Sequence, residues 1–170
     1  MRTVALISIT VLALSTSPAV GATFRVPQQF PAIQPAIDAA ATGDTVLVSS
    51  GVYAGSENTN LHFDGKDLVL KSRFGSRSTI ILLGVNDRAV ELTAGESAAA
   101  VVDGFTMRGS GVHAARDGGA VYCSGSSPTI RRCVIEGNAA DRGAGVFLAS
   151  SDAVIKDCDI RDNNANFTLG

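Results

Sequence analysis

The fold is decided by two consecutive stretches of equal length. Residues 118–142 read GGAVYCSGSSPTIRRCVIEGNAADR, and residues 143–167 read GAGVFLASSDAVIKDCDIRDNNANF. They align without a gap, and their identical pairs include Ile130 with Ile155, Cys133 with Cys158, and Asn138 with Asn163. Self-similarity at a fixed period of about 20–50 residues is typical of a solenoid. We therefore expect one turn of a coil, here called a rung, per repeat, with the matched residues stacked along the axis.

Looser copies of this unit lie upstream. The segment 102–110 matches 130–138 at an offset of 28, and segments 67–72 and 78–82 have the same strand–turn–strand rhythm. Apolar residues alternate within each strand, which places one set of side chains inside the coil. No helical segment separates the strands, so a βαβ sheet is excluded. We predict an all-β right-handed parallel β-helix, a single-stranded solenoid with rungs about 4.8 Å apart.

The first 22 residues are predicted to be a secretory signal peptide. Arg2 precedes an apolar run over residues 4–14, and small residues follow up to Ala22, after which we expect cleavage. The run is too short to span a membrane. We therefore expect a secreted, periplasmic or cell-surface protein with no membrane span after removal of the signal.

Residues 23–50 are predicted to form a strand, a capping helix and a first full strand. The helix begins at Pro31, lasts about ten residues, directs Ile33 and Ile37 inward and is ended by Gly43. Residues 51–170 are predicted to be β-helix rungs without a C-terminal cap. We expect further rungs or another chain to cover that end.

The three cysteines are interpreted as structural. An odd number excludes a complete disulfide framework, and the absence of a CxxC pair argues against a metal site. Cys133 and Cys158 are expected one rung apart on the inner face, within disulfide range but with parallel side chains. Stacked buried thiols are favoured, and a bridge stays open as the alternative. The predicted structural ladders comprise Cys133, Cys158, Asn138, Asn163, Ile130 and Ile155.

The charge pattern offers few sites. With 14 basic and 16 acidic residues, no electrostatic argument for nucleic-acid binding exists. Asp157 and Asp159 are the candidate catalytic residues, because two positions apart on one strand they would share a face. They replace Arg132 and Val134 of the preceding repeat, which favours solvated surface positions. Arg132 is expected to stack over Asp157 as an ion pair.

Other polar residues are interpreted as structural. We interpret Asp103 as a turn cap. His62 and His113 each stand alone in expected loops and are interpreted as surface residues. No cofactor is predicted.

Three stretches together resemble a known family. They are FRVPQQFPAIQPAIDAA (24–40) followed by GDTVLV (43–48), FDGKDLVLKS (63–72), and SSPTI (126–130) with Cys133 and Asn138. The chain resembles bacterial secreted right-handed β-helix proteins of the pectin-lyase-like superfamily over residues 24–165. This resemblance implies the β-helix fold and a class that includes polysaccharide lyases, glycoside hydrolases, epimerases and carbohydrate-binding surface proteins. Fold alone does not decide among them.

Two function classes follow. The first is a secreted or cell-surface module that binds a glycan or a protein on its solenoid face, with no catalytic site in this segment. The second is the N-terminal part of a polysaccharide lyase or glycoside hydrolase. Ca²⁺ would enter only under the lyase alternative, where carboxylates hold it against a uronate.

Overall fold

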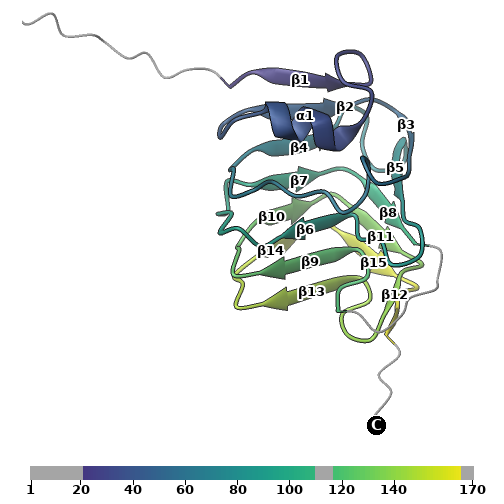
Figure 1. Cartoon of the computed structure of the whole chain (residues 1–170). Helices are drawn as coiled ribbons and strands as arrows, with labels where there is room; N and C mark the ends of the chain where they lie inside the picture. Colours follow the sequence, from purple (N-terminus) through teal and green to yellow (C-terminus); the bar gives the residue numbers. More distant parts are fainter. Residues whose placement is uncertain (1–20, 110–116, 166–170) are drawn as a thin grey trace, which may run out of the picture.

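The protein is a right-handed parallel β-helix of about five turns. The structure, a computed structural model, describes residues 21–109 and 117–165. Figure 1 shows the strands stacked in columns from the N-terminal end (purple) to the C-terminal end (yellow). The predicted fold class is confirmed. Most of the predicted signal peptide, and His113, lie outside the described residues.

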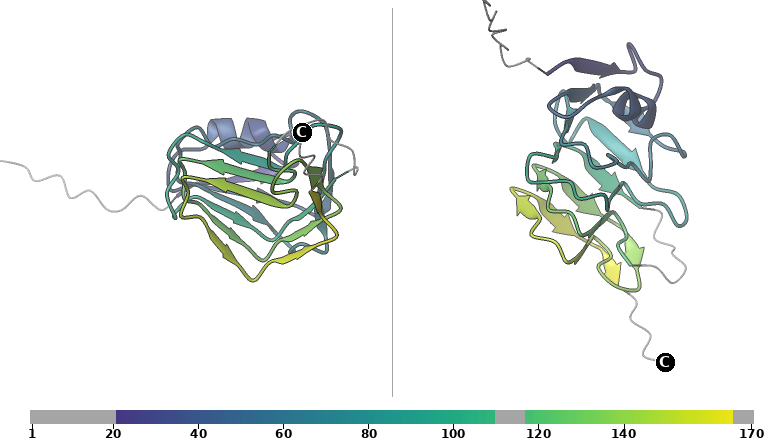
Figure 2. Two further views of the ribbon diagram at one scale, coloured as in Figure 1. Left: turned by 90° about the horizontal axis from the view of Figure 1, so that it is seen from below. Right: turned by 60° about the vertical axis from the view of Figure 1, so that its left-hand side comes forward.

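Four stacked sheets form the walls of the coil. The six-stranded sheet contains β1 (Thr23–Val26), β2 (Thr45–Val48), β4 (Val69–Ser72), β7 (Val101–Asp103), β10 (Thr129–Arg131) and β14 (Val154–Lys156). The five-stranded sheet contains β3 (Gly51–Tyr53), β5 (Thr79–Leu82), β8 (Thr106–Arg108), β11 (Val134–Glu136) and β15 (Asp159–Arg161). The three-stranded sheet contains β6 (Val90–Leu92), β9 (Val121–Ser124) and β13 (Val146–Ala149), and the two-stranded sheet β12 (Ala139–Ala140) and β16 (Asn164–Ala165). Figure 2 shows them from below, enclosing one interior.

The interior is filled by apolar residues stacked in register. Val46, Leu70, Val102 and Ile130 lie one above another and are completely buried. Burying each such aliphatic side chain contributes about 1.5–3 kcal/mol relative to exposing it. Ile155 continues the ladder on the last described rung but is only half-buried. The register confirms the predicted offsets of 28 and 25.

Asparagines join successive rungs at the corner that follows β11 and β15. The Asn138 amide nitrogen Nδ2 donates to Oδ1 of Asn163 at 2.8 Å and to the carbonyl of Met107 at 3.2 Å. Asn163 in turn donates to the carbonyl of Ile135 at 2.8 Å. Each asparagine thus donates to a strand carbonyl of the preceding rung, and the two side chains are joined to each other.

The N-terminal helix α1 (Ile33–Ala39) is shorter than predicted. Starting at Ile33 places Pro35 in the first turn, where its missing N–H costs no intrahelical hydrogen bond. The helix ends before Gly43, because Ala40 already has an extended backbone. Ile33 and Ile37 are completely buried, as predicted, and α1 packs against β1 and β2 at the N-terminal end of the coil (Figure 1).

A single left-handed residue turns the chain between the six-stranded and five-stranded sheets on successive rungs. Gly104, Arg132 and Asp157 occupy this corner with φ values of 80°, 53° and 53°. A left-handed conformation disfavours residues with a Cβ atom, so glycine at 104 adopts it without strain. The corner separates β14 from β15, so Asp157 belongs to neither strand.

Candidate functional site

The outer face of the six-stranded sheet carries a column of cations. The strand register places these outward residues one above another: Arg25, Leu47, Lys71, Asp103, Arg131 and Lys156. Neighbouring strands are about 4.8 Å apart, so like charges in such a column repel each other. Asp103 offsets this repulsion because it lies between Lys71 and Arg131.

Asp103 holds two arginines at the surface. Its side chain is 2% exposed, and its carboxylate accepts hydrogen bonds from Nε of Arg131 at 3.1 Å and Nε of Arg132 at 2.8 Å. An unpaired carboxylate would be strongly unfavourable at this depth. Of the arginine side chains, 37% and 54% respectively remain exposed. The buried anion therefore orients two guanidinium groups that still face solvent.

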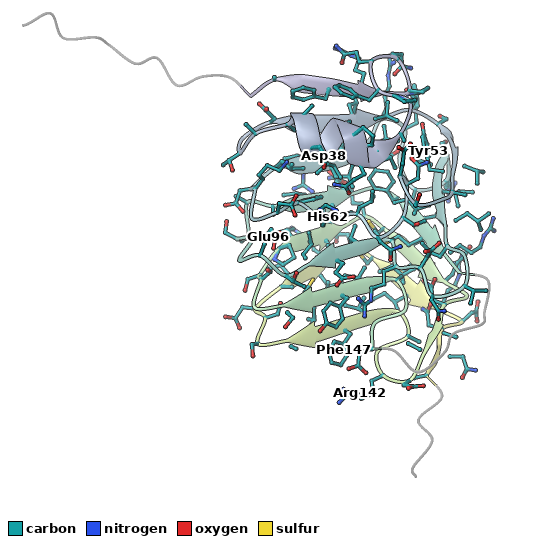
Figure 3. The ribbon with its side chains drawn as sticks, in the orientation of Figure 1. Asp38, Tyr53, His62, Glu96, Arg142 and Phe147 are labelled. Carbon is teal, nitrogen blue, oxygen red and sulfur yellow. The ribbon has the colours of Figure 1, made fainter. Side chains whose placement is uncertain are left out.

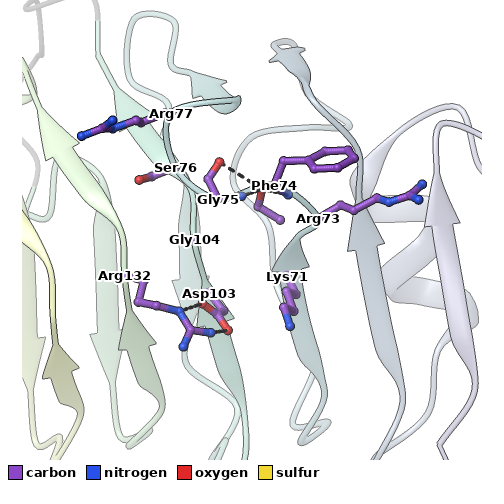
Figure 4. A pocket seen from close by; sticks show the side chains of 10 residues that line it. Lys71, Arg73, Phe74, Gly75, Ser76, Arg77, Asp103, Gly104 and Arg132 are labelled. Atoms are coloured by element: carbon purple, nitrogen blue, oxygen red, sulfur yellow. Dashed lines mark hydrogen bonds and ion pairs between the residues drawn. The ribbon is translucent and has the colours of Figure 1, made fainter.

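A hollow of about 430 Å³ lies beside this cluster, over the corner between the two larger sheets. We call it the basic hollow; its lining residues are Lys71, Ser72, Arg73, Phe74, Gly75, Ser76, Arg77, Asp103, Gly104 and Arg132. Figure 4 shows Lys71 on one side and Arg132 with Asp103 on the other, while Arg73 and Arg77 point away from its ends.

The loop that borders the basic hollow is held by hydrogen bonds to the buried hydroxyl of Ser72. The Ser72 hydroxyl accepts hydrogen bonds from the amides of Phe74 at 3.3 Å and Gly75 at 2.9 Å. It also lies 2.7 Å from the hydroxyl of Thr79, and both hydroxyl-bearing side chains are buried. The loop therefore has a defined shape before any ligand arrives.

Positive charge is concentrated in the basic hollow. Lys71 and Arg132 flank it, Arg73 and Arg77 lie at its ends, and Asp103 is its one carboxylate, although the whole chain has a net charge of −2. Within the described residues the side chains of Lys71 and Arg77 form no hydrogen bond or ion pair, and Arg73 lies over the Phe74 ring at 5.1 Å from its centroid. Clustered cations in a concave surface attract anions. The arrangement suits a ligand with carboxylate or sulfate groups.

A neighbouring hollow over the five-stranded sheet has paired charges. Its volume is about 560 Å³. Glu136 lies 3.8 Å from Arg108 and 2.6 Å from Arg161, and Arg161 also contacts Asp159. This surface therefore offers little net charge to a ligand.

A third hollow, of about 370 Å³, lies on the front of the molecule near His62 (Figure 3). His62 Nδ1 is 2.9 Å from the Asp64 carboxylate, and the Glu91 carboxylate is 2.7 Å from the guanidinium of Arg88. His62 is exposed, as predicted for a surface residue, but it does not stand alone because Asp64 pairs with it. With Asp64 and Glu91 in its lining, this hollow disfavours anions.

The aromatic residues on the same front are covered by cations. Tyr122 and Phe147 stack with ring centroids 5.5 Å apart and planes 7° apart. Arg88 covers Tyr122 at 4.1 Å and Arg142 covers Phe147 at 5.4 Å. Because the outer ring faces are occupied, this stack joins rungs and is not an open platform for sugar rings.

The predicted catalytic pair is not assembled. Asp157 occupies the left-handed corner, whereas Asp159 begins β15 and contacts Arg161. The corner breaks the strand alternation that would have put both on one face. The expected ion pair between Arg132 and Asp157 is also wrong, because Arg132 binds Asp103. Asp103 consequently serves as an arginine partner and not as a turn cap.

The three cysteines are free thiols. Burial raises the pKa of Cys123 to about 12. Contact with the Cys158 thiol and burial raise the pKa of Cys133, whereas contact with the Cys133 thiol lowers the pKa of Cys158 to about 6. Cys158 is half-buried and Cys133 is 1% exposed. The two stacked thiols therefore differ in access and in acidity.

Several residues of the basic hollow were missed by sequence reasoning. Lys71, Arg73 and Arg77 lie in the irregular upstream copies, where alignment is loose. A signal did exist for Asp103, because the offset of 28 aligns it with Arg131, the residue that it binds. We interpreted Asp103 as a turn cap because Gly104 follows it, and so its alignment with Arg131 was not used.

Comparison with protein-family models, with curated proteins and with solved structures gives no match for this chain. In residues 21–109 and 117–165, no helix is long and apolar enough to cross a membrane. The same residues contain no group of three or more His, Cys, Asp or Glu side chains that could hold a metal ion.

Proposed function

We propose that this chain is a secreted or cell-surface β-helix module, of the pectin-lyase-like type that its sequence resembles, which binds an acidic polysaccharide in the basic hollow. The observation that carries this proposal is Lys71, unpaired within the described residues, facing Arg132, which a buried Asp103 holds in place. Two cations across a concave surface match carboxylates on a polymer.

The cation column extends the hollow along the solenoid axis. Arg131 and Lys156 continue it on the outer face of the same sheet, one rung apart. A linear polymer lying along the axis would meet the cations of the hollow and then Arg131 and Lys156 on two successive rungs, and each contact would add a modest, salt-sensitive attraction. We therefore expect the overall affinity to rise with polymer length, because it comes from several weak contacts and not from one strong one.

The test compares polymers that differ in charge. We expect native-gel migration of the protein to be retarded by polygalacturonate and not by a neutral galactan. Raising the salt concentration should weaken the retardation because the contacts are exposed. Equal retardation by both polymers, or by neither, would contradict acidic-glycan binding.

Two variants locate the site. Lys71→Gln and Arg132→Gln should each weaken retention by polygalacturonate about tenfold, corresponding to about 1.4 kcal/mol. Arg142→Gln is the matched control, because Arg142 is an exposed arginine on the opposite side of the coil paired with Asp117. Loss of binding in the control alone would place the site elsewhere.

The enzymatic alternative makes a different prediction. The single carboxylate in the basic hollow, Asp103, is occupied by two arginines, so it is poorly placed to bind Ca²⁺ or to act as a base. Incubation with polygalacturonate or alginate, with and without Ca²⁺, should release no oligosaccharide. Product that disappears in Asp157→Ala or Asp159→Ala protein would favour the lyase or hydrolase.

A further inference from the structure

The sulfur atoms of Cys133 and Cys158 belong to directly stacked residues on adjacent rungs. Residues on both sides are paired in register, Arg131 with Lys156 and Val134 with Asp159. The amide of Asp159 also donates to the carbonyl of Cys133 at 2.9 Å. Stacked residues of neighbouring strands are about 4.8 Å apart, which lies inside the Cα separation of about 4.4–6.8 Å found in disulfides.

The Cys158 thiol reaches towards the rung of Cys133. Its Sγ lies 3.6 Å from the carbonyl oxygen of Ile130, on that rung, and 3.4 Å from the carbonyl oxygen of Lys156. Cys133 Sγ lies 3.2 Å from the carbonyl oxygen of Arg131, on the same rung as Ile130. Both thiols therefore lie in the same corner of the coil.

Access differs between the two sulfur atoms. Cys158 is half-buried on the last described rung, whereas Cys133 is 1% exposed beneath it. Within the described rungs a reagent from solvent meets Cys158 first, and Cys133 is placed to react only with a group already attached there. This is the arrangement of an attacking thiol and a resolving thiol.

We propose that Cys133 and Cys158 form a covalent modification site, which a small-molecule disulfide closes to an inter-rung disulfide bond. The Cys158 thiolate attacks one sulfur of the small disulfide, forms a mixed disulfide and releases one small thiolate. The Cys133 thiol then attacks the Cys158 sulfur, transfers its proton to the second departing small thiolate and forms the Cys133–Cys158 bond. The two cysteines are oxidised together, and the small disulfide is reduced to two thiols. This site is independent of the proposed glycan binding.

Cys123 provides an internal control. It is completely buried on β9, and its register neighbours on the adjacent rungs are Leu92 and Leu148. It therefore has no thiol partner in register. Cys123→Ser should leave the modification site intact and simplify the measurement.

The experiment treats reduced, folded protein with oxidised glutathione and follows the mass of the intact chain. Cys123→Ser protein should lose two hydrogen atoms and yield a linked peptide pair containing Cys133 and Cys158. Removal of Cys133 as well should trap one glutathione on Cys158, because no resolving thiol is left. Removal of Cys158 instead should slow modification at least tenfold, because Cys133 is covered.

Three results with the variants would overturn the proposal. They are stable glutathione on both cysteines of the Cys123→Ser protein, equal modification rates in the two double variants, or no reaction of the folded protein. Peptide mapping of the wild-type chain answers the same question if a variant fails to fold. A linked pair that contains Cys123 would also contradict the proposal.

Discussion

At the scale of single residues, two buried carboxylates form hydrogen bonds that connect neighbouring rungs. Asp103 and Glu96 are both buried, and each accepts a hydrogen bond from a side chain of the next rung. Asp103 binds guanidinium groups that still face solvent, whereas Glu96 (Figure 3) accepts from two amides and a hydroxyl inside a corner. The first orients two guanidinium groups at the surface, and the second joins rungs.

Replacing Asp103 should affect both stability and binding. Asp103→Asn leaves Arg131 and Arg132 beside each other without an anion, so we expect a loss of about 1–3 kcal/mol in the free energy of unfolding. Urea denaturation measures this loss. The matched control is Asp159→Asn, whose partner Arg161 is exposed, and it should change stability by less than about 0.5 kcal/mol. Equal effects of the two variants would argue against the role of Asp103.

Glu96 should give a pH-dependent contribution. Burial alone would raise its pKa, but hydrogen bonds from Ser126, Gly65 and Ala94 lower it overall. A pKa lower in the folded than in the unfolded chain gives stability that is present above about pH 4.3 and is lost as pH falls through the folded value. We expect Glu96→Gln to be destabilised at pH 7 and to approach the wild type in acid. Glu57→Gln, at an exposed position, should be unaffected; a Glu96→Gln deficit that is independent of pH would contradict this account.

At the scale of elements, corners decide what the strands can present. One left-handed residue joins the two larger sheets on successive rungs, and glycine is replaced there by Arg132 and then Asp157. The strands themselves are only two to four residues long. If a corner is predicted at the wrong residue, the wrong side chains are predicted to share a face. This happened for Asp157 and Asp159.

The corner at Asp157 should tolerate glycine. Asp157→Gly relieves the left-handed strain and should raise the free energy of unfolding by up to about 1 kcal/mol. Asp159→Gly, in a strand, should lower it by about 0.5–1 kcal/mol. Thermal or urea unfolding of the two variants measures the difference, and destabilisation by Asp157→Gly would show that its side chain has a role beyond the turn.

At the scale of the whole molecule, the solenoid is a stack in which each rung depends on its neighbours. Ile130 is completely buried between two rungs, whereas its counterpart Ile155 on the last described rung is half-buried. We expect Ile130→Val to cost about 0.5–1.5 kcal/mol and Ile155→Val clearly less. Equal losses in urea denaturation would indicate that the last described rung is covered in solution, as the expectation of further rungs or another chain at that end requires.

The fold was predictable because stacking requires repetition. Identical residues at Ile130 and Ile155, and at Asn138 and Asn163, mark positions where the coil demands the same chemistry on each rung. The basic hollow has no such repetition. It combines Lys71, a loop of irregular length and a buried Asp103. Only the strand register shows that these residues lie side by side. Their contacts depend on offsets that differ between rungs, so spacing in the sequence did not reveal them.

The central claim is that the basic hollow binds an acidic polysaccharide, and calorimetric titration of a short oligogalacturonate tests it most directly. The wild-type protein should bind in low salt, and Lys71→Gln should bind about tenfold more weakly. Arg142→Gln should bind as the wild type does. Unchanged affinity in Lys71→Gln protein that unfolds at the wild-type urea concentration would contradict the claim.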